Sequence, residues 1–139
     1  MVSDMRTFQL EIVTPDGSAY SGEAESLLVR TDDGDVEILA GHADYLATLA
    51  TGRARIRTST GDRIGALSGG FISVDKNSVK LVATTFEFAD EIDINRARAA
   101  KERAEEALTR AKNDRDILLA KAKLKRAISR ISVAENNHR

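Results

Sequence analysis

The sequence predicts an α+β protein, with an N-terminal antiparallel β-sandwich or barrel followed by a C-terminal hairpin of two helices. Residues 1–90 contain all nine glycines, the single proline and all six aromatic residues of the chain. Apolar residues recur at every second position in that part and at every third or fourth position after it. We therefore expect two domains, a sandwich over 1–90 and a helical domain over 91–139.

Short strands account for the first part. FQLEIVTP, at 8–15, alternates its apolar and polar side chains, and Pro-Asp-Gly at 15–17 fits a tight turn. Further strands are expected at ESLLVRT (25–31), at VEIL (36–39) and, roughly three or four in number, within residues 52–84. The lack of helix-length segments between them argues against a parallel sheet.

Two amphipathic helices account for the second part, at 93–112 and 117–134, and NDRD (113–116) reverses the chain between them. Asn113 or Asp114 is expected to cap the second helix. The expected seam consists of Ala97, Ala100, Ala104, Leu108 and Ala111 on the first helix, and Ile117, Ala120, Leu124, Ile128 and Ile131 on the second. Alanine buries little area, so we expect this αα-hairpin to open at modest cost.

Composition excludes several classes of function. The chain has no cysteine, and its two histidines are His42 and His138, so neither thiolate chemistry nor a histidine metal site is expected. It has no apolar run of about 20 residues and no signal-peptide pattern, so we expect an intracellular protein without membrane insertion. Residues 1–90 carry 8 Lys/Arg and 14 Asp/Glu, a net of −6, whereas residues 91–139 carry 13 and 8, a net of +5.

Three short motifs resemble functional sites, but each lacks residues that such a site requires. GALSGGF (65–71) lacks the Lys-Ser/Thr ending of a phosphate loop and is expected to be a tight turn. His42 has no recognisable nucleophile to activate, and DDGD (32–35) lacks the spacing of a calcium loop. We therefore expect no catalytic residues, no metal site and no enzyme activity.

The second helix offers a cationic face. Arg126 and Arg130 stand four residues apart, with Lys123 nearby, and guanidinium groups bind phosphate well. A solvated, salt-bridged face is the alternative. Nucleic-acid binding is not expected, because no aromatic residue stands near for stacking.

Asp93 and Arg96 begin the first helix. Asp93 is explained as an N-cap, but a cation in the first turn is mildly unfavourable. If the helices pair antiparallel, these two residues lie near Arg126 and Arg130 at the far end of the second helix. So many guanidinium groups beside one acid indicate an anionic ligand, such as a nucleotide phosphate.

The chain resembles the epsilon subunits of bacterial F-type ATP synthases over nearly its whole length. The resemblance is carried by the opening segment FQLEIVTPDGSAYSGEAESLLVRTDDGDVEILAGHADYLATL, by LSGGFISV and by KRAISRISVAE. It implies a sandwich of about ten strands that docks on the gamma subunit and the c-ring. It also implies a mobile hairpin that, when extended, reaches the alpha/beta subunits and suppresses ATP hydrolysis, at the cytoplasmic face of the bacterial plasma membrane.

Some members of this family bind ATP as a regulatory ligand on the compact hairpin. Their motif, Ile or Leu, Asp, two variable residues, Arg and Ala, matches residues 92–97. The resemblance therefore implies a nucleotide site formed by Glu87, Ile92, Asp93, Arg96, Ala97, Arg126 and Arg130. A requirement for Mg²⁺ stays open, and an adaptor whose hairpin only packs, without a ligand, is the alternative.

Overall fold

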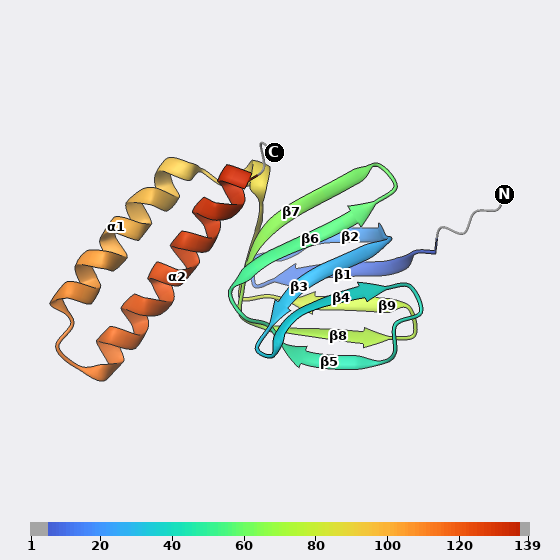
Figure 1. Cartoon of the computed structure of the whole chain (residues 1–139), viewed down its shortest axis with the longest axis horizontal. Coiled ribbons are helices and arrows are strands. Elements are labelled where there is room, and N and C mark those ends of the chain that lie inside the picture. Colours follow the sequence, from blue (N-terminus) through green and yellow to red (C-terminus); the bar gives the residue numbers. More distant parts are fainter. Residues whose placement is uncertain (1–5, 137–139) are drawn as a thin grey trace. The chain divides into compact units, whose positions relative to one another are not determined.

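The protein divides into two compact units, Met1–Phe88 and Ala89–Arg139. The structure is a computed structural model that describes residues 6–136, so His138 lies outside the described part. The first unit contains only strands and the second only helices (Figure 1).

Ten strands form the first unit, and they confirm the predicted sandwich (Figure 1). They are β1 (Phe8–Thr14), β2 (Gly17–Ala24), β3 (Ser26–Thr31), β4 (Gly34–Leu39), β5 (Tyr45–Thr48), β6 (Gly52–Thr58), β7 (Gly61–Ser68), β8 (Phe71–Asp75), β9 (Ser78–Val82) and β10 (Thr85–Phe88). Sheet A has the order β2-β1-β9-β8-β5, and sheet B has the order β10-β7-β6-β3-β4. One pair, β1 with β9, is parallel, and the other pairs within the sheets are antiparallel.

Three strands, β2, β5 and β10, were not predicted from the sequence. β2 begins at Gly17, the last residue of the predicted Pro-Asp-Gly turn, and its small polar residues have low strand propensity. Its pairing with β1 holds it in place, including a register shift between Ile12 and Val13. β5 and β10 have four residues each, too few to display a period. These three segments are therefore strands because they pair with neighbouring strands, and not because of their own sequence patterns.

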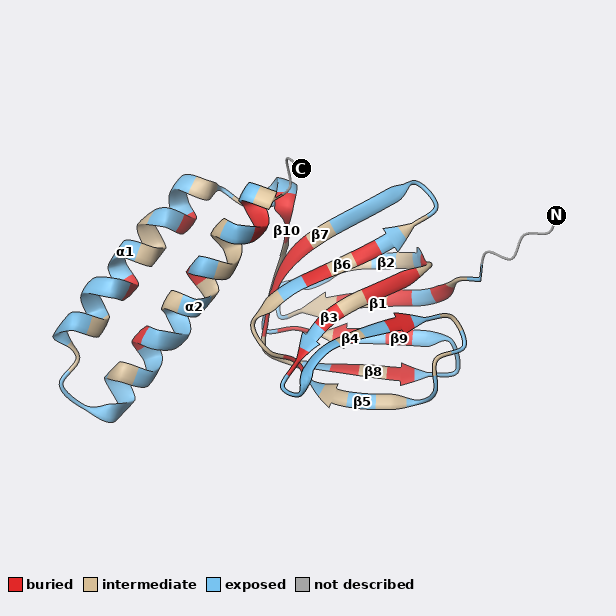
Figure 2. Ribbon diagram, in the orientation of Figure 1, coloured by how far each residue is buried: buried red, intermediate tan, exposed pale blue. Residues whose placement is uncertain are grey.

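The core lies between the sheets, because each strand directs alternate side chains inward. Leu10 and Ile12 of β1, Ile56 of β6, Ile72 of β8 and Leu81 of β9 are fully buried. Figure 2 shows buried stretches on strands of both sheets. The side chains between these buried positions therefore lie on the outer faces of the two sheets.

Two α-helices form the second unit, α1 (Ile94–Arg110) and α2 (Asp114–Asn136), preceded by a short 3₁₀ helix, η1 (Ala89–Glu91). Asn113 caps α2 as expected: its Oδ1 accepts a hydrogen bond of 2.8 Å from the backbone N–H of Asp116. Within the described part of the chain, neither helix is long and apolar enough to span a bilayer.

Most buried positions of the two helices face each other, as Figure 2 shows. Five of them are alanines that repeat every seven residues, Ala97 and Ala104 on α1 and Ala120, Ala127 and Ala134 on α2, and the buried Val133 of α2 lies outside this repeat. We call these five alanines the alanine seam. The expected place of Ile128 in it is wrong, because Ile128 is 48% exposed and Ala127 takes the seam position. Ile128 follows Ala127 by one residue and therefore lies about 100° further round α2, toward solvent, while the small side chains of the repeat let the helices approach closely.

Candidate functional site

Asp93 is the N-cap of α1. Its backbone is extended, with φ −82° and ψ 103°, and its side chain accepts a hydrogen bond of 3.1 Å from the backbone N–H of Arg96. Its carbonyl oxygen accepts a further bond of 3.0 Å from the backbone N–H of Ala97. Capping alone therefore explains why an aspartate stands at position 93. A role for Asp93 in binding a ligand has to be argued from the residues around it.

One ion pair shows which flanks of the two helices lie on the same side of the hairpin. Arg98 Nη2, in the second turn of α1, lies 3.4 Å from Glu135 Oε2, near the end of α2. Arg98 follows the buried Ala97 by one residue, and Glu135 follows the buried Ala134 by one residue. Successive residues are about 100° apart around a helix. The side that follows each seam alanine is therefore a single flank of the hairpin.

The residues that precede the seam positions lie on the opposite flank, and three of them are arginines: Arg96 and Arg103 on α1, which precede Ala97 and Ala104, and Arg126 on α2, which precedes Ala127. Arg130, four residues after Arg126, shares its side of α2. We call these four residues the arginine flank. Three of them belong to the expected site, so the fold brings Arg96, Arg126 and Arg130 to one side of the hairpin.

The arginine flank is a stripe rather than a single cluster. The contact between Arg98 and Glu135 sets the start of α1 level with the end of α2. With a rise of 1.5 Å per residue, Arg130 lies about 10 Å and Arg126 about 16 Å along the hairpin from Arg96. An extended anion suits this arrangement better than a compact one.

The guanidinium groups of the stripe are accessible to different degrees. Arg96 and Arg103 are exposed, while Arg126 and Arg130 are half-buried. Within residues 6–136, Arg96 and Arg126 form no hydrogen bond or ion pair through their side chains. A half-buried guanidinium without a counter-ion has its fork of N–H donors available for phosphate oxygens.

The remaining expected site residues have separate surroundings. Ile92 is half-buried, and its backbone N–H donates to the carbonyl of Ala89 at 3.3 Å. Ala97 is fully buried in the seam, where only a small side chain fits. Glu87 belongs to β10 of the first unit. Sequence reasoning missed Arg103, although its seven-residue spacing from Arg96 is a sufficient signal once Ala97 is assigned to the seam.

The other motifs have structural explanations. His42 Nδ1 lies 2.7 Å from the carbonyl oxygen of Ala43, and the His42 ring packs edge-on against Tyr45. DDGD forms the turn between β3 and β4, where Thr31 Oγ1 donates to the carbonyl of Gly34 at 2.8 Å. Residues 6–136 contain no group of three or more acidic or histidine side chains placed to hold a metal ion.

Two family descriptions cover nearly all of the chain. "ATP synthase, Delta/Epsilon chain, beta-sandwich domain" matches residues 7–89, and "ATP synthase, Delta/Epsilon chain, long alpha-helix domain" matches residues 90–135. Each description coincides with one unit of the structure. The alpha-helix description includes the whole arginine flank.

Individual relatives agree with these matches. The ATP synthase epsilon chain of Bacillus pumilus is 42% identical over 94% of this chain and 98% of its own length. The sodium-ion-specific ATP synthase epsilon chain of Propionigenium modestum is 35% identical over 94% of this chain and 96% of its own length. A chain in the mitochondrial ATP synthase of Euglena gracilis has the same fold, with a TM-score of 0.76 at 19% identity over 100% of this chain and 88% of that one.

Proposed function

The chain belongs to the ATP synthase delta/epsilon chain family, and from this membership we propose how its two units divide the work of an epsilon subunit. An epsilon subunit is a non-catalytic component of the central stalk of ATP synthase. The proposal assigns docking to the sandwich and ATP-dependent regulation to the hairpin.

The sandwich docks this subunit on the rotor, against the gamma subunit and the c-ring. Exposed apolar residues on the outer face of sheet A support this assignment, because such residues mark protein contacts. Leu46 of β5 is 72% exposed, and Phe71 of β8 is 42% exposed. The subunit is thereby held peripherally at the cytoplasmic face of the bacterial plasma membrane and contributes to coupling proton flow with ATP synthesis.

The hairpin binds ATP on its arginine flank. The observation that carries this proposal is the contact between Arg98 and Glu135, because it sets Arg96, Arg103, Arg126 and Arg130 together on the other flank. A triphosphate is an extended anion with several oxygens, and it matches a stripe of guanidinium forks. Asp93 caps the helix that carries Arg96 and Ala97, and Ile92 and Glu87 precede this cap in sequence.

ATP binding regulates hydrolysis by shifting a conformational equilibrium. The compact hairpin presents the arginine flank as one surface, and an extended hairpin separates α1 from α2. ATP binds the compact form more tightly and therefore increases its population, since a ligand shifts an equilibrium only by its differential affinity. When ATP is scarce, the extended hairpin reaches the alpha/beta subunits and inhibits hydrolysis.

Titration of the isolated chain with ATP tests the regulatory site, with and without Mg²⁺. We expect saturable binding that weakens about tenfold or more in Arg126→Ala, because a charged hydrogen-bond partner of a phosphate is lost. Lys125→Ala is the matched control, since Lys125 is exposed on the outer side of α2. Absence of ATP binding by the wild-type chain would establish the alternative, a stalk adaptor whose hairpin only packs.

A further inference from the structure

The backbone of β10 gives this strand little hold on the sandwich. β10 has four residues and lies at the edge of sheet B, where it pairs with β7. Figure 2 shows the strand at this edge. Short edge strands open most readily, because few hydrogen bonds and a single neighbour hold them. The side chains of β10 therefore have a large share in keeping it in the sheet.

The two aromatic side chains of β10 point into the sandwich. Phe86 pairs across the strands with the buried Leu67, and Phe88 pairs with Gly65. Residues that pair directly lie on the same face of a sheet, so both rings leave the inner face. Phe88 is 3% exposed, and the Phe86 ring meets it edge-on, with the ring centroids 4.9 Å apart. Glu87 stands between them and is therefore directed to the outer face.

Arg63 of β7 covers the ring of Phe88. Arg63 pairs with the fully buried Ile56, so its side chain also leaves the inner face, although it is exposed at the rim of the core. Its Cζ lies 3.6 Å from the centroid of the Phe88 ring, within the range of a cation–π interaction. Tyr20 of β2 meets the same ring edge-on, with the centroids 6.3 Å apart. We call Tyr20, Arg63 and Phe88 the β10 clamp.

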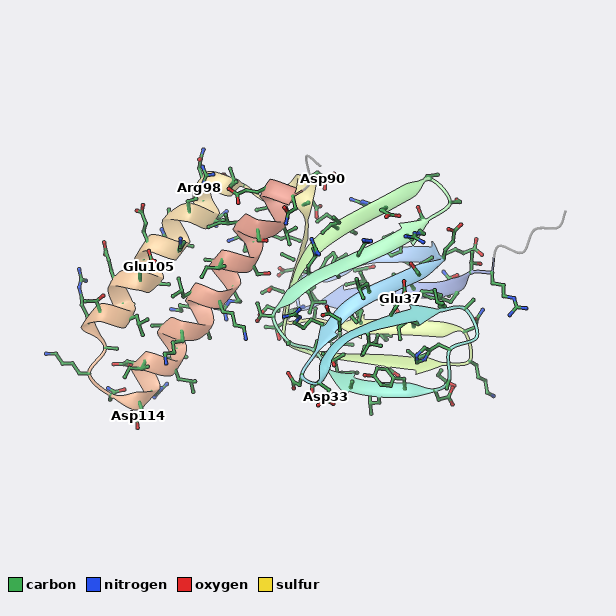
Figure 3. The ribbon with its side chains drawn as sticks, in the orientation of Figure 1. Asp33, Glu37, Asp90, Arg98, Glu105 and Asp114 are labelled. Carbon is green, nitrogen blue, oxygen red and sulfur yellow. The ribbon has the colours of Figure 1, made fainter. Side chains whose placement is uncertain are left out.

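The clamp lies where the two units join in the sequence. The first unit ends at Phe88 and the second begins at Ala89. The chain continues from β10 into η1, where Figure 3 labels Asp90. A movement of the hairpin acts first on β10, because β10 is the strand joined to it. A clamp on the last residue of β10 therefore confines such a movement to the second unit.

We propose that Arg63 is a positioning residue for the ATP site, and that it acts through Phe88 on Glu87. Glu87 is the residue of that site that the first unit supplies. Neighbouring side chains of a strand leave opposite faces, so a clamp that holds the Phe88 ring inward also holds the Glu87 carboxylate outward. This inference rests on the proposed function, since it assumes that Glu87 contacts ATP.

Hydrogen exchange of the isolated chain tests the clamp without any ligand. Arg63→Met keeps an aliphatic side chain beside the ring and removes the cation. An exposed cation–π contact is weak, so we expect the amides of residues 85–88 to exchange about two- to fivefold faster, with β1 and β6 unchanged. Arg63→Lys keeps a cation and should exchange nearly as slowly as the wild type.

Arg57→Met is the matched control for Arg63→Met. It makes the same change at an exposed arginine of sheet B, and Arg57 pairs with Ser26 and Asp62 rather than with a residue of β10. The amides of residues 85–88 should therefore exchange in Arg57→Met as they do in the wild type.

ATP titration of a double-mutant cycle tests the positioning role. Arg63→Met should weaken ATP binding about two- to fivefold, and Arg57→Met should leave it unchanged. Glu87→Gln should weaken binding as well. Arg63→Met should have no further effect in the Glu87→Gln background, because both changes then remove the same contribution. A purely structural role for Arg63 gives additive losses instead.

Several results overturn the inference. Wild-type exchange at residues 85–88 in Arg63→Met removes the clamp, and equal acceleration in β1 and β6 reduces it to overall stability. Additive losses in the double variant show that Arg63 does not act through Glu87. Unchanged ATP binding by Arg63→Met, when the wild type binds, defeats this inference alone. Failure of the wild-type chain to bind ATP defeats the proposed function and the positioning role together, so the two failures are distinguishable.

Discussion

The ring of Phe86 lies directly over Gly65. A Cβ atom added at Gly65 would stand 2.4 Å from Phe86 Cζ and 3.0 Å from the carbonyl oxygen of Glu87. Gly65 lies on β7 and Phe86 on β10, the last strand of sheet B. The aromatic ring occupies the space that a side chain on β7 would fill. This contact helps to hold β10, a strand of only four residues, against β7.

Gly65→Ala should therefore destabilise the sandwich by about 1–3 kcal/mol, because the overpacked ring or β10 has to shift. Gly22→Ala is the matched control. A Cβ atom there meets only the end of the Tyr20 side chain, with Oη nearest at 3.4 Å, which is an ordinary contact. Urea unfolding of both variants measures the difference in stability. Equal unfolding midpoints would show that β10 shifts to accommodate the new methyl group without loss of stability.

The alanine seam leads to a second prediction. Ala104→Leu should destabilise the hairpin by about 1–3 kcal/mol, because a leucine at a 3% exposed seam position forces the helices apart. Ala107→Leu places the same side chain at an exposed position of α1 and should leave stability within about 0.5 kcal/mol. Thermal unfolding followed by helical circular dichroism compares the two, and tolerance of leucine at position 104 would contradict a tight seam.

The capping and ligand roles of Asp93 can be separated. Asp93→Ala should lower hairpin stability by about 1 kcal/mol, because the backbone N–H of Arg96 loses its acceptor. Asp93→Asn keeps an acceptor oxygen, so hairpin stability should stay near that of the wild type. If Asp93→Asn nevertheless binds ATP less well, the carboxylate acts on the ligand, and unchanged ATP titrations restrict Asp93 to capping.

The sequence anticipated the hairpin better than the sandwich edges, for a physical reason. Helices depend on local spacing, so three of the five seam alanines, Ala97, Ala104 and Ala120, and the cap at Asn113 were readable along the chain. β2, β5 and β10 depend on partners far away in sequence, and the parallel pairing of β1 with β9 leaves no local trace. Ile128 was misplaced because hydrophobicity suggested a seam position that tight packing reserves for Ala127.

The candidate site was predictable in part. Its residue types were evident at Asp93, Arg96, Arg126 and Arg130, and the expectation that the helices pair antiparallel placed them near one another. The flank they share was not evident, because it depends on which residue of each turn is buried. The structure supplies that information through the contact between Arg98 and Glu135. A site across two helices is therefore defined by packing rather than by the motif alone.

The ion pair between Arg30 and Asp35 makes the sandwich sensitive to acid. The hydrogen bond from Arg30, reinforced by attraction to Arg30 and Arg53, holds the pKa of Asp35 below its ordinary value. The pair therefore contributes stability above the ordinary pKa of about 4, and that contribution is lost as the pH falls through the lowered pKa. Asp35→Asn should unfold at lower urea than the wild type at pH 7, and the gap should close at about pH 2. An equal gap at both pH values would contradict this assignment.

The division of the hairpin into two flanks leads to the last prediction. Arg103 shares the arginine flank with Arg96, whereas Arg98 stands on the opposite flank beside Glu135. Arg103→Ala should therefore weaken ATP binding several-fold, since one cation of the stripe is lost. Arg98→Ala removes the same charge from the same helix and should leave ATP binding unchanged, with a loss of stability below about 1 kcal/mol from its exposed ion pair. Calorimetric titration of both variants decides the matter, because net charge alone would weaken binding equally in the two, whereas a ligand on the arginine flank distinguishes them.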